Sequence, residues 1–317
     1  MRMTQGSRAA RMIGVGGFVP QGVVDNEELA ARFGKPPEWF ESRTGMSTRA
    51  RAGETTLTEM AVEAGAAALA DAKVDPEQID LVITATCSAD APIPAVAYEV
   101  IRDLEIKSAA AFDLNTACSG FCYALTVAND LIRAGTANTV LITAAERMTA
   151  ITDPDDLPTS VVFGDGAGAA VVTGSDEPGI GPVVWGSDAS GTDLIVQDPG
   201  DRYLRMEGQK VFRWATTQIH PIALSACEQA GVHPSELAAV VPHQANLRIV
   251  DALASKIGAT NAVVARDGAQ TGNTSAASIP LALRRLMDTG QVASGDLALL
   301  VGFGAGLSYA AQVVRVP

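Results

Sequence analysis

The chain has 317 residues, of which 47% are hydrophobic, 19% charged and 5% aromatic, an ordinary composition for a soluble globular protein. Its net charge of −13 argues against nucleic acid as a partner, because neutralising phosphates requires a basic surface. No stretch approaches the ~18 uninterrupted apolar residues of a membrane span, and no signal-peptide pattern stands at the start, so we expect a cytoplasmic protein that binds no membrane.

Strands and helices alternate along the first half of the sequence. A helical periodicity begins near Thr56 or Thr58, either of which can cap a helix, and the apolar run 80–86 is typical of a buried strand. A second helix is expected over 119–135, with Gly135 just beyond its end. Further strands are expected over 11–20, 139–146 and 168–173.

The second half continues the alternation. A long helical segment is expected over 207–231, with a kink or break at Pro221, because proline has no N–H to donate to the helix. A buried strand over 237–242 and a helix beginning after residue 273 follow. Such alternation predicts an α/β fold in which helices cover sheets on both faces.

The two halves also resemble each other. The stretches 70–83 and 228–241 share a V-x-P turn between a helix and a strand, at an offset of 158 residues. The same offset places "NTACSGFCYAL" on "NTSAASIPLAL", and the glycine-rich 164–172 and 302–314 echo each other at an offset of 138. We therefore predict two similar halves, 1–173 and 174–317, with an active site at the seam between them.

Four cysteines, Cys87, Cys118, Cys122 and Cys227, lie scattered without the paired spacing of zinc ligands, so free thiols are expected. Cys118 opens the helix of 119–135, where unpaired N–H groups and the positive end of the helix dipole would lower a thiol pKa. Small neighbours would let a substrate reach its sulfur. From position alone Cys118 is either a packing residue or a nucleophile, and Cys122, one turn on, is expected in the core.

Two further polar residues stand out. His243 follows the buried strand and opens a polar cluster, where sheet proteins place ligand-binding residues, so a functional and a structural role are both open for it. Asn273, just before a helix, reads from its position as a helix cap. His220 is expected to be structural and His233 exposed.

Taken together and in order, "NTACSGF", "PHQANLRI" and "GNTSAASIP" resemble the β-ketoacyl-acyl-carrier-protein synthase III family of the thiolase superfamily. The motifs "EWFESRTGM", "FGDGAGAAVV" and "GFGAG" fit as well, and the resemblance covers about 13–316. It implies a thiolase-like, five-layered αβαβα fold built from two duplicated halves, usually as a homodimer.

The resemblance also implies a mechanism. Cys118 would attack an acyl-CoA primer, and neutral His243 and Asn273 would stabilise the enolate left when malonyl-acyl carrier protein (malonyl-ACP) loses CO₂. Backbone N–H groups of Cys118 and Ala305 would form an oxyanion hole. Such a decarboxylative Claisen condensation initiates fatty acid or polyketide biosynthesis and needs no metal or other cofactor.

Binding positions follow from the same resemblance. Six residues match CoA and pantetheine contacts: Trp39, Arg43, Gly208, Phe212, Ala245 and Asn246. Seven match the docking face for the carrier protein: Gln244, Ala245, Asn246, Leu247, Arg248, Arg213 and Lys256. Ile93 matches a position that closes the acyl pocket of the partner in a dimer, where an aliphatic side chain suggests a wider or branched primer.

The chain departs from the family pattern in three places. Leu157 stands where an arginine usually sandwiches adenine with the tryptophan, "GKPPEW" replaces an acidic and serine-containing run, and the segment between Asp188 and Glu207 is short. The first two departures put the affinity for CoA in question.

Two other functions remain open: a non-decarboxylating acyltransferase of the same fold, and a catalytically silent partner subunit. The second is disfavoured because Cys118, His243 and Asn273 are all present. Elongating synthases carry a second histidine where Asn273 stands, and thiolases carry a cysteine after the position of Cys227, so the resemblance disfavours both relatives.

Overall fold

The computed structural model describes residues 6–317; the start of the chain, on which the expectation of no signal peptide partly rests, lies outside the described residues. Two five-stranded sheets form the framework. In the first, parallel pairing of β4 with β5 and β6 is flanked by antiparallel β7 and β1. Its order is β1 (Ala9–Phe18), β7 (Asp165–Ser175), β6 (Thr139–Arg147), β4 (Leu81–Ala85) and β5 (Ala110–Leu114).

The second sheet repeats this topology. Its order is β12 (Val263–Val264), β11 (Ala239–Pro242), β13 (Leu297–Gly304), β14 (Ser308–Arg315) and β8 (Val184–Ser187). Read from β8, each strand has a counterpart with the same neighbours and the same parallel or antiparallel pairing in the first sheet. The predicted duplication is therefore confirmed. The strands of the first sheet lie within 9–175 and those of the second within 184–315, which supports our proposal of a division near residue 173.

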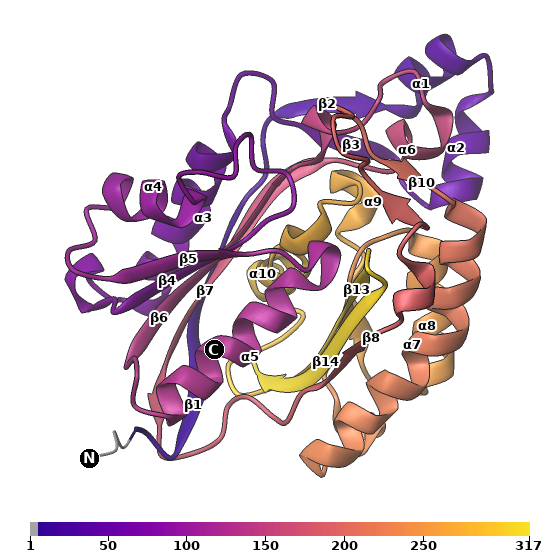
Figure 1. The fold of residues 1–317 in the computed structure, drawn as a ribbon. Coiled ribbons are helices and arrows are strands. Elements are labelled where there is room, and N and C mark those ends of the chain that lie inside the picture. Colours follow the sequence, from indigo (N-terminus) through magenta and orange to yellow (C-terminus); the bar gives the residue numbers. More distant parts are fainter. Residues whose placement is uncertain (1–5) are drawn as a thin grey trace.

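Helices complete five layers, as Figure 1 shows. Helices α5 (Gly120–Arg133) and α10 (Ser278–Asp288) lie between the two sheets, where their apolar side chains join one core with both sheets. On the outer face of the first sheet lie α3 (Leu57–Ala72) and α4 (Val96–Asp103), and on that of the second lie α7 (Gly208–Ala230) and α8 (Leu247–Ile257). The predicted αβαβα fold is thus confirmed.

Shorter elements connect these layers. One group lies at the upper right of Figure 1, with the antiparallel pair β2 and β3 to the left of α1 and α2. Its bounds are β2 (Gly22–Asp25), α1 (Asn26–Phe33), α2 (Pro37–Thr44), β3 (Thr48–Arg51), α6 (Leu157–Ser160) and α9 (Gly268–Thr271). Strands β9 (Ile195–Val196) and β10 (Arg205–Met206) form a small sheet of their own. Single turns of 3-10 helix are η1 (Pro76–Gln78), η2 (Ala117–Ser119), η3 (Met148–Ala150), η4 (Ala189–Gly191), η5 (Pro234–Glu236) and η6 (Ser275–Ala277).

Some predictions about individual helix ends and turns are confirmed and others are wrong. Thr56 caps α3 through a reciprocal pair of hydrogen bonds with Glu59, and Gly135 follows α5 with φ 73°, as expected. The predicted break at Pro221 is wrong, because α7 runs unbroken through it. The echo between 164–172 and 302–314 is also misleading: "GDGAG" begins strand β7, whereas "GFGAG" ends β13 and forms the turn before β14.

The clearest sign of duplication lies in two turns. The Asn115 side-chain oxygen accepts a hydrogen bond from Ala117 N at 3.1 Å, and Asn273 does the same with Ser275 N at 2.8 Å. Ala117 and Ser275 both adopt positive φ, 47° and 48°, a conformation that side chains rarely tolerate without local support. Each turn leads through a 3-10 turn into a central helix, so both halves deliver a polar loop to the same region.

Candidate active site

A cavity of about 1010 Å³ opens where strands and helices of both halves end. Cys118 and Asn115 line it from the first half, and His243, Asn273 and Ala305 from the second. The three side chains expected to carry the chemistry, far apart in sequence, thus meet on one cavity.

Cys118 lies in the 3-10 turn immediately before α5 and is 8% exposed. Backbone N–H groups of Cys118 and Ala305 lie close enough to its sulfur to favour the thiolate form. Gly304 lies directly against it, since a Cβ on Gly304 would come within 2.7 Å of the Cys118 Cβ. Glycine at this position therefore lets β13 approach Cys118 closely enough to place the Ala305 N–H beside it.

The expectation of a lowered thiol pKa is wrong for the resting protein. Burial raises the pKa of Cys118 to about 12, although the Ser275 hydroxyl and the two backbone N–H groups act in the opposite direction. Desolvation of a thiolate outweighs these few donors. Cys118 is therefore a protonated thiol at neutral pH, so any reaction through its thiolate requires that proton to leave.

His243 is neutral, as expected for a hydrogen-bond donor to an enolate. Burial lowers its pKa to about 3, against a smaller opposite effect of the Ser275 carbonyl. The ring packs edge-on to Phe303, with ring centroids 5.2 Å apart, and Nδ1 lies 2.8 Å from the Ser278 hydroxyl. These contacts fix the ring orientation from β13 and α10.

Asn273 is held by its own loop. Its side-chain oxygen accepts the Ser275 N–H, while its backbone N–H donates to the Val162 carbonyl at 2.9 Å and its carbonyl accepts from Gly164 N at 3.0 Å. With the amide oxygen occupied, the amide N–H₂ is the group left to serve the cavity. The cap-like position noticed in the sequence is real, yet its hydrogen bond orients the amide.

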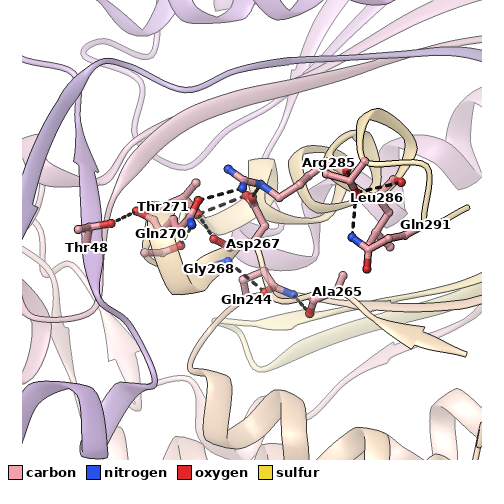
Figure 2. Close-up of polar contacts among 12 residues, drawn as sticks. Thr48, Gln244, Ala265, Asp267, Gly268, Gln270, Thr271, Arg285, Leu286 and Gln291 are labelled. Carbon is pink, nitrogen blue, oxygen red and sulfur yellow. Dashed lines mark hydrogen bonds and ion pairs between the residues drawn. The ribbon is translucent and has the colours of Figure 1, made fainter. Parts of the chain in front are cut away.

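Figure 2 shows a polar cluster around α9 that includes Gln244, Asp267 and Arg285. The Gln244 amide donates to the Ala265 carbonyl at 3.1 Å and accepts from Gly268 N at 3.1 Å, and Asp267 forms an ion pair with Arg285. Gln244 is fully buried. Helix α9, which leads to Asn273, is thereby tied to the loop that carries His243.

This burial corrects part of the predicted carrier-protein face. Gln244 and Leu247 are 0% and 1% exposed, so their side chains cannot touch a docked protein. Gln244 braces the catalytic loop, and Leu247 packs in a core with Phe40 and Met46. Their neighbours Ala245 and Asn246 are half-buried and line the cavity.

The remaining basic candidates lie on the surface. Arg248 is exposed at the cavity rim, its guanidinium carbon 5.3 Å from the ring centroid of Phe212. Arg213 also lines the cavity. Lys256 does not, and its ammonium donates to the Thr216 carbonyl at 2.5 Å.

The predicted CoA contacts surround the same opening. Arg43, Gly208, Phe212, Ala245 and Asn246 line the cavity. The Arg43 guanidinium carbon lies 5.6 Å from the ring centroid of Trp39, whereas Leu157 packs against the apolar cluster that Trp39 also joins. A cation does therefore face the tryptophan, but it comes from α2 rather than from the position of Leu157.

Ile93 does not line the cavity of its own chain and is 84% exposed. Its role at the pocket of a partner stays a prediction that depends on dimer formation.

Three residues near Cys118 were not predicted from the sequence to belong to the site. Cys87 lines the cavity, the Ser275 hydroxyl lowers the pKa of Cys118, and Glu146 is a fully buried carboxyl group that accepts from Ser275. A charged residue ending the apolar strand "TVLITAAE" was the available signal for Glu146.

Three structural observations concern metal ions, membranes and disulfides. Within residues 6–317 no three His, Cys, Asp or Glu side chains gather in an arrangement that could hold a metal ion. None of the helices in that range combines the length and hydrophobicity needed to cross a bilayer. All four cysteines are free thiols, as expected.

The buried neutral state of His243 should make stability depend on pH. Its pKa is about 3 in the native protein against 6.5 for an ordinary histidine, so below about pH 6.5 the unfolded state binds a proton that the native state does not. This contribution lowers the free energy of unfolding by up to ~1.4 kcal/mol per pH unit as pH falls. In the wild type, the free energy of unfolding measured with urea should therefore fall between pH 7 and pH 5. In His243→Gln this fall should be smaller by up to ~2 kcal/mol. The control His233→Gln, at an exposed site, should keep the wild-type difference; an unchanged difference in His243→Gln would contradict the burial argument.

The duplicated five-layer fold, with cysteine, histidine and asparagine on one cavity, defines a condensing enzyme of the thiolase superfamily. Family models described as 3-oxoacyl-[acyl-carrier-protein (ACP)] synthase III and its C-terminal part match residues 112–189 and 227–316. A β-ketoacyl-[acyl-carrier-protein] synthase III from Streptomyces avermitilis is 49% identical, covering 97% of this chain and 99% of its own. Another from Streptomyces coelicolor is 49% identical, covering 99% and 100%.

Solved structures agree. The priming β-ketosynthase from the R1128 polyketide pathway superposes with a TM-score of 0.96 at 44% identity, covering 100% of this chain and 98% of its own. The synthase III from Pseudomonas aeruginosa PAO1 gives 0.92 at 37% identity, covering 98% and 99%. The chain belongs to the β-ketoacyl-ACP synthase III family and is an acyl-transferring condensing enzyme that initiates fatty acid or polyketide synthesis.

Proposed function

We propose that this enzyme condenses a short acyl-CoA primer with malonyl-ACP through an acyl-Cys118 intermediate. The observation that carries the proposal is the convergence of Cys118, His243 and Asn273 on one cavity, which Ala305 also lines. A cavity of about 1010 Å³ also suits a pantetheine arm and a short acyl chain.

Each residue has a distinct task in this scheme. The Cys118 sulfur attacks the thioester, the N–H groups of Cys118 and Ala305 hold the developing oxyanion, and CoA leaves. Malonyl thioester then enters and loses CO₂. The enolate oxygen accepts hydrogen bonds from neutral His243 and the Asn273 amide, and the carbanion attacks the acyl-Cys118 carbonyl. The resulting β-ketoacyl thioester leaves on the carrier protein.

A coupled assay tests the proposal against its alternative. The enzyme is incubated with a panel of straight and branched acyl-CoAs and malonyl-ACP, and CO₂ and β-ketoacyl-ACP are measured. Stoichiometric CO₂ and product support the condensation. Consumption of acyl-CoA without CO₂ release would favour a non-decarboxylating acyltransferase, and absence of both reactions would fit a silent subunit.

Docking of the carrier protein should depend on Arg248. We expect Arg248→Glu to raise KM for malonyl-ACP about 10-fold, because losing an interfacial charge pair and adding repulsion costs about 1.4 kcal/mol or more. KM for malonyl-CoA should change less than 3-fold. Arg315→Glu is the matched control, since Arg315 is exposed at the end of β14 remote from Gly304. Equal effects on both malonyl donors would contradict a docking role.

We further propose a homodimer formed along β5. This strand is an edge of the first sheet and carries Phe112, which is 36% exposed. Nearby in sequence, Tyr98 and Ile93 are 56% and 84% exposed. An apolar edge strand is a template for pairing with another chain. Light scattering should give twice the chain mass of 32.7 kDa, and a Phe112→Lys variant should shift the measured mass towards that of the monomer.

The four free thiols support a reducing compartment such as the cytoplasm.

A further inference from the structure

Behind the nucleophile lies a carboxyl group that the proposed reaction does not use. Glu146, at the end of β6, is 0% exposed. The Ser275 hydroxyl donates to its Oε1 at 2.8 Å, and the Ser88 hydroxyl to its Oε2 at 2.5 Å. Thr86 Oγ1, the Cys87 N–H and thiol, and the Ala276 N–H complete its surroundings.

Every one of these partners can donate, and the two backbone N–H groups can only donate. A carboxylate, which only accepts, matches such a shell. Among residues 6–317 no arginine, lysine or histidine forms an ion pair with Glu146. A buried carboxylate without a cation is expensive to maintain, which points to a use beyond packing.

Ser275 connects this carboxyl group to the cavity. Its hydroxyl lies close enough to Cys118 to lower the pKa of that thiol, and it lies 3.5 Å from the Cys87 sulfur. Because its own proton is directed at Glu146, the oxygen is free to accept from Cys118. Ser275 adopts a positive φ of 48°, and in this conformation its hydroxyl reaches Glu146.

We propose that Glu146 takes up the Cys118 proton through Ser275 when the thiol attacks, and that it thereby acts as a positioning and proton-holding residue for acylation. The inference rests on the proposed acyl-Cys118 intermediate.

The transfer balances. The Cys118 S–H proton moves to Ser275 Oγ while the Ser275 proton moves to Glu146 Oε1, leaving a thiolate and a neutral carboxylic acid. The thiolate forms its bond to the thioester carbonyl carbon, and the bond from that carbon to the CoA sulfur breaks. The leaving CoA thiolate receives the proton back along the same path, so CoA leaves as a thiol and Glu146 returns to its carboxylate.

The surroundings favour Glu146 over His243 as the acceptor. Burial raises the pKa of Glu146 above its ordinary value, which makes it a better base, whereas the pKa of His243 is about 3. Cys87 is the other titratable side chain bonded to Glu146, and burial raises its pKa well above the usual range. Cys87 therefore stays protonated and contributes a donor rather than competing for the proton.

The test is the pH dependence of Cys118 alkylation by iodoacetamide, followed by peptide mass analysis. If the proton moves internally, the thiolate fraction is constant wherever the pair holds one proton, because the transfer changes no net charge. The wild type should then show a pH-independent plateau around neutral pH. Glu146→Gln should lose the plateau and rise about tenfold per pH unit, a change that a merely structural role would not produce.

Further variants separate a relay from a fold defect. Ser275→Ala keeps the carboxyl group but breaks the path, so it should lose the plateau as well. Each variant should slow acylation by acyl-CoA at least ~10²-fold, and the double variant should be no slower than either. Asp165→Asn is the matched control: Asp165 is equally buried and accepts from Ala52 N, Thr149 N and the Thr149 hydroxyl, whereas Glu146 accepts from Ser275. It should keep the plateau.

A plateau retained in both Glu146→Gln and Ser275→Ala would overturn the relay and return the proton to His243 or solvent. If Glu146→Gln does not fold, Ser275→Ala alone decides the question in the same way. Since iodoacetamide needs no acyl donor, failure of every acyl-CoA to label Cys118 would sink the proposed function without touching this result. Labelled Cys118 with unchanged pH profiles would sink the relay alone.

Discussion

Replacing Cys118 by alanine should lower kcat/KM for the condensation at least ~10³-fold, since removal of a nucleophile leaves only binding and oxyanion stabilisation. No acyl-enzyme should form from any acyl-CoA. The fold should persist, because Cys118 is a small side chain that lines the cavity, 8% exposed. The measurement is the steady-state rate of β-ketoacyl-ACP formation, with circular dichroism to show that the variant is folded.

Cys122 provides the matched control on the same helix. It is fully buried in the central core and does not line the cavity. Cys122→Ala should lose stability by about 1 kcal/mol, as is usual for a small core truncation, and keep kcat within about 3-fold because no reacting group changes. If Cys118→Ala retained acylation and condensation, the assignment of the nucleophile would be wrong.

Replacing Asn273 by aspartate should separate the two halves of the reaction. In the proposed mechanism the amide N–H₂ donates to the developing enolate, and the substitution replaces it with an anion of nearly the same shape. Losing one such donor typically costs ~10²–10³ in rate, and the added charge should increase the loss. Acylation of Cys118 by acyl-CoA should fall much less, because the N–H groups of Cys118 and Ala305 serve that step.

Rapid quenching resolves the two steps: the acyl-enzyme burst reports the first and CO₂ release the second. Asn261→Asp, an exposed site, should leave both unchanged. His243→Ala should follow Asn273→Asp in losing CO₂ release, since both side chains act on the same oxygen. Equal losses of burst and CO₂ release in Asn273→Asp would indicate that Asn273 shapes the cavity rather than the enolate site.

Much of this site could be predicted because its parts lie at strand and helix ends. The offset of 158 residues placed the loops of Asn115 and Asn273 in equivalent positions, and the structure gives both the same asparagine-capped turn. His243 could be located from the buried strand before it. These features are local, and local sequence patterns carry them.

The predictions that were wrong concern residues whose surroundings come from distant segments of the chain. The helix-end argument for Cys118 ignored the desolvation imposed by β13 and by the loop of Ser275, so it gave the wrong direction for the thiol pKa. Gln244 reads as a surface residue in "PHQANLR", but α9 covers it. The group of Glu146, Ser275 and Cys87 joins three segments, and no spacing in the sequence reveals it.

The most direct test of the central claim is mass analysis of the active-site peptide. The enzyme is mixed with one equivalent of acyl-CoA, quenched and digested, and the peptide containing Cys118 is compared before and after a chase with malonyl-ACP. The acyl mass should appear on Cys118 and disappear during the chase as CO₂ and β-ketoacyl-ACP form in equal amounts. Persistent absence of the acyl mass while product accumulates, or its presence on Cys87 instead, would contradict an acyl-Cys118 intermediate.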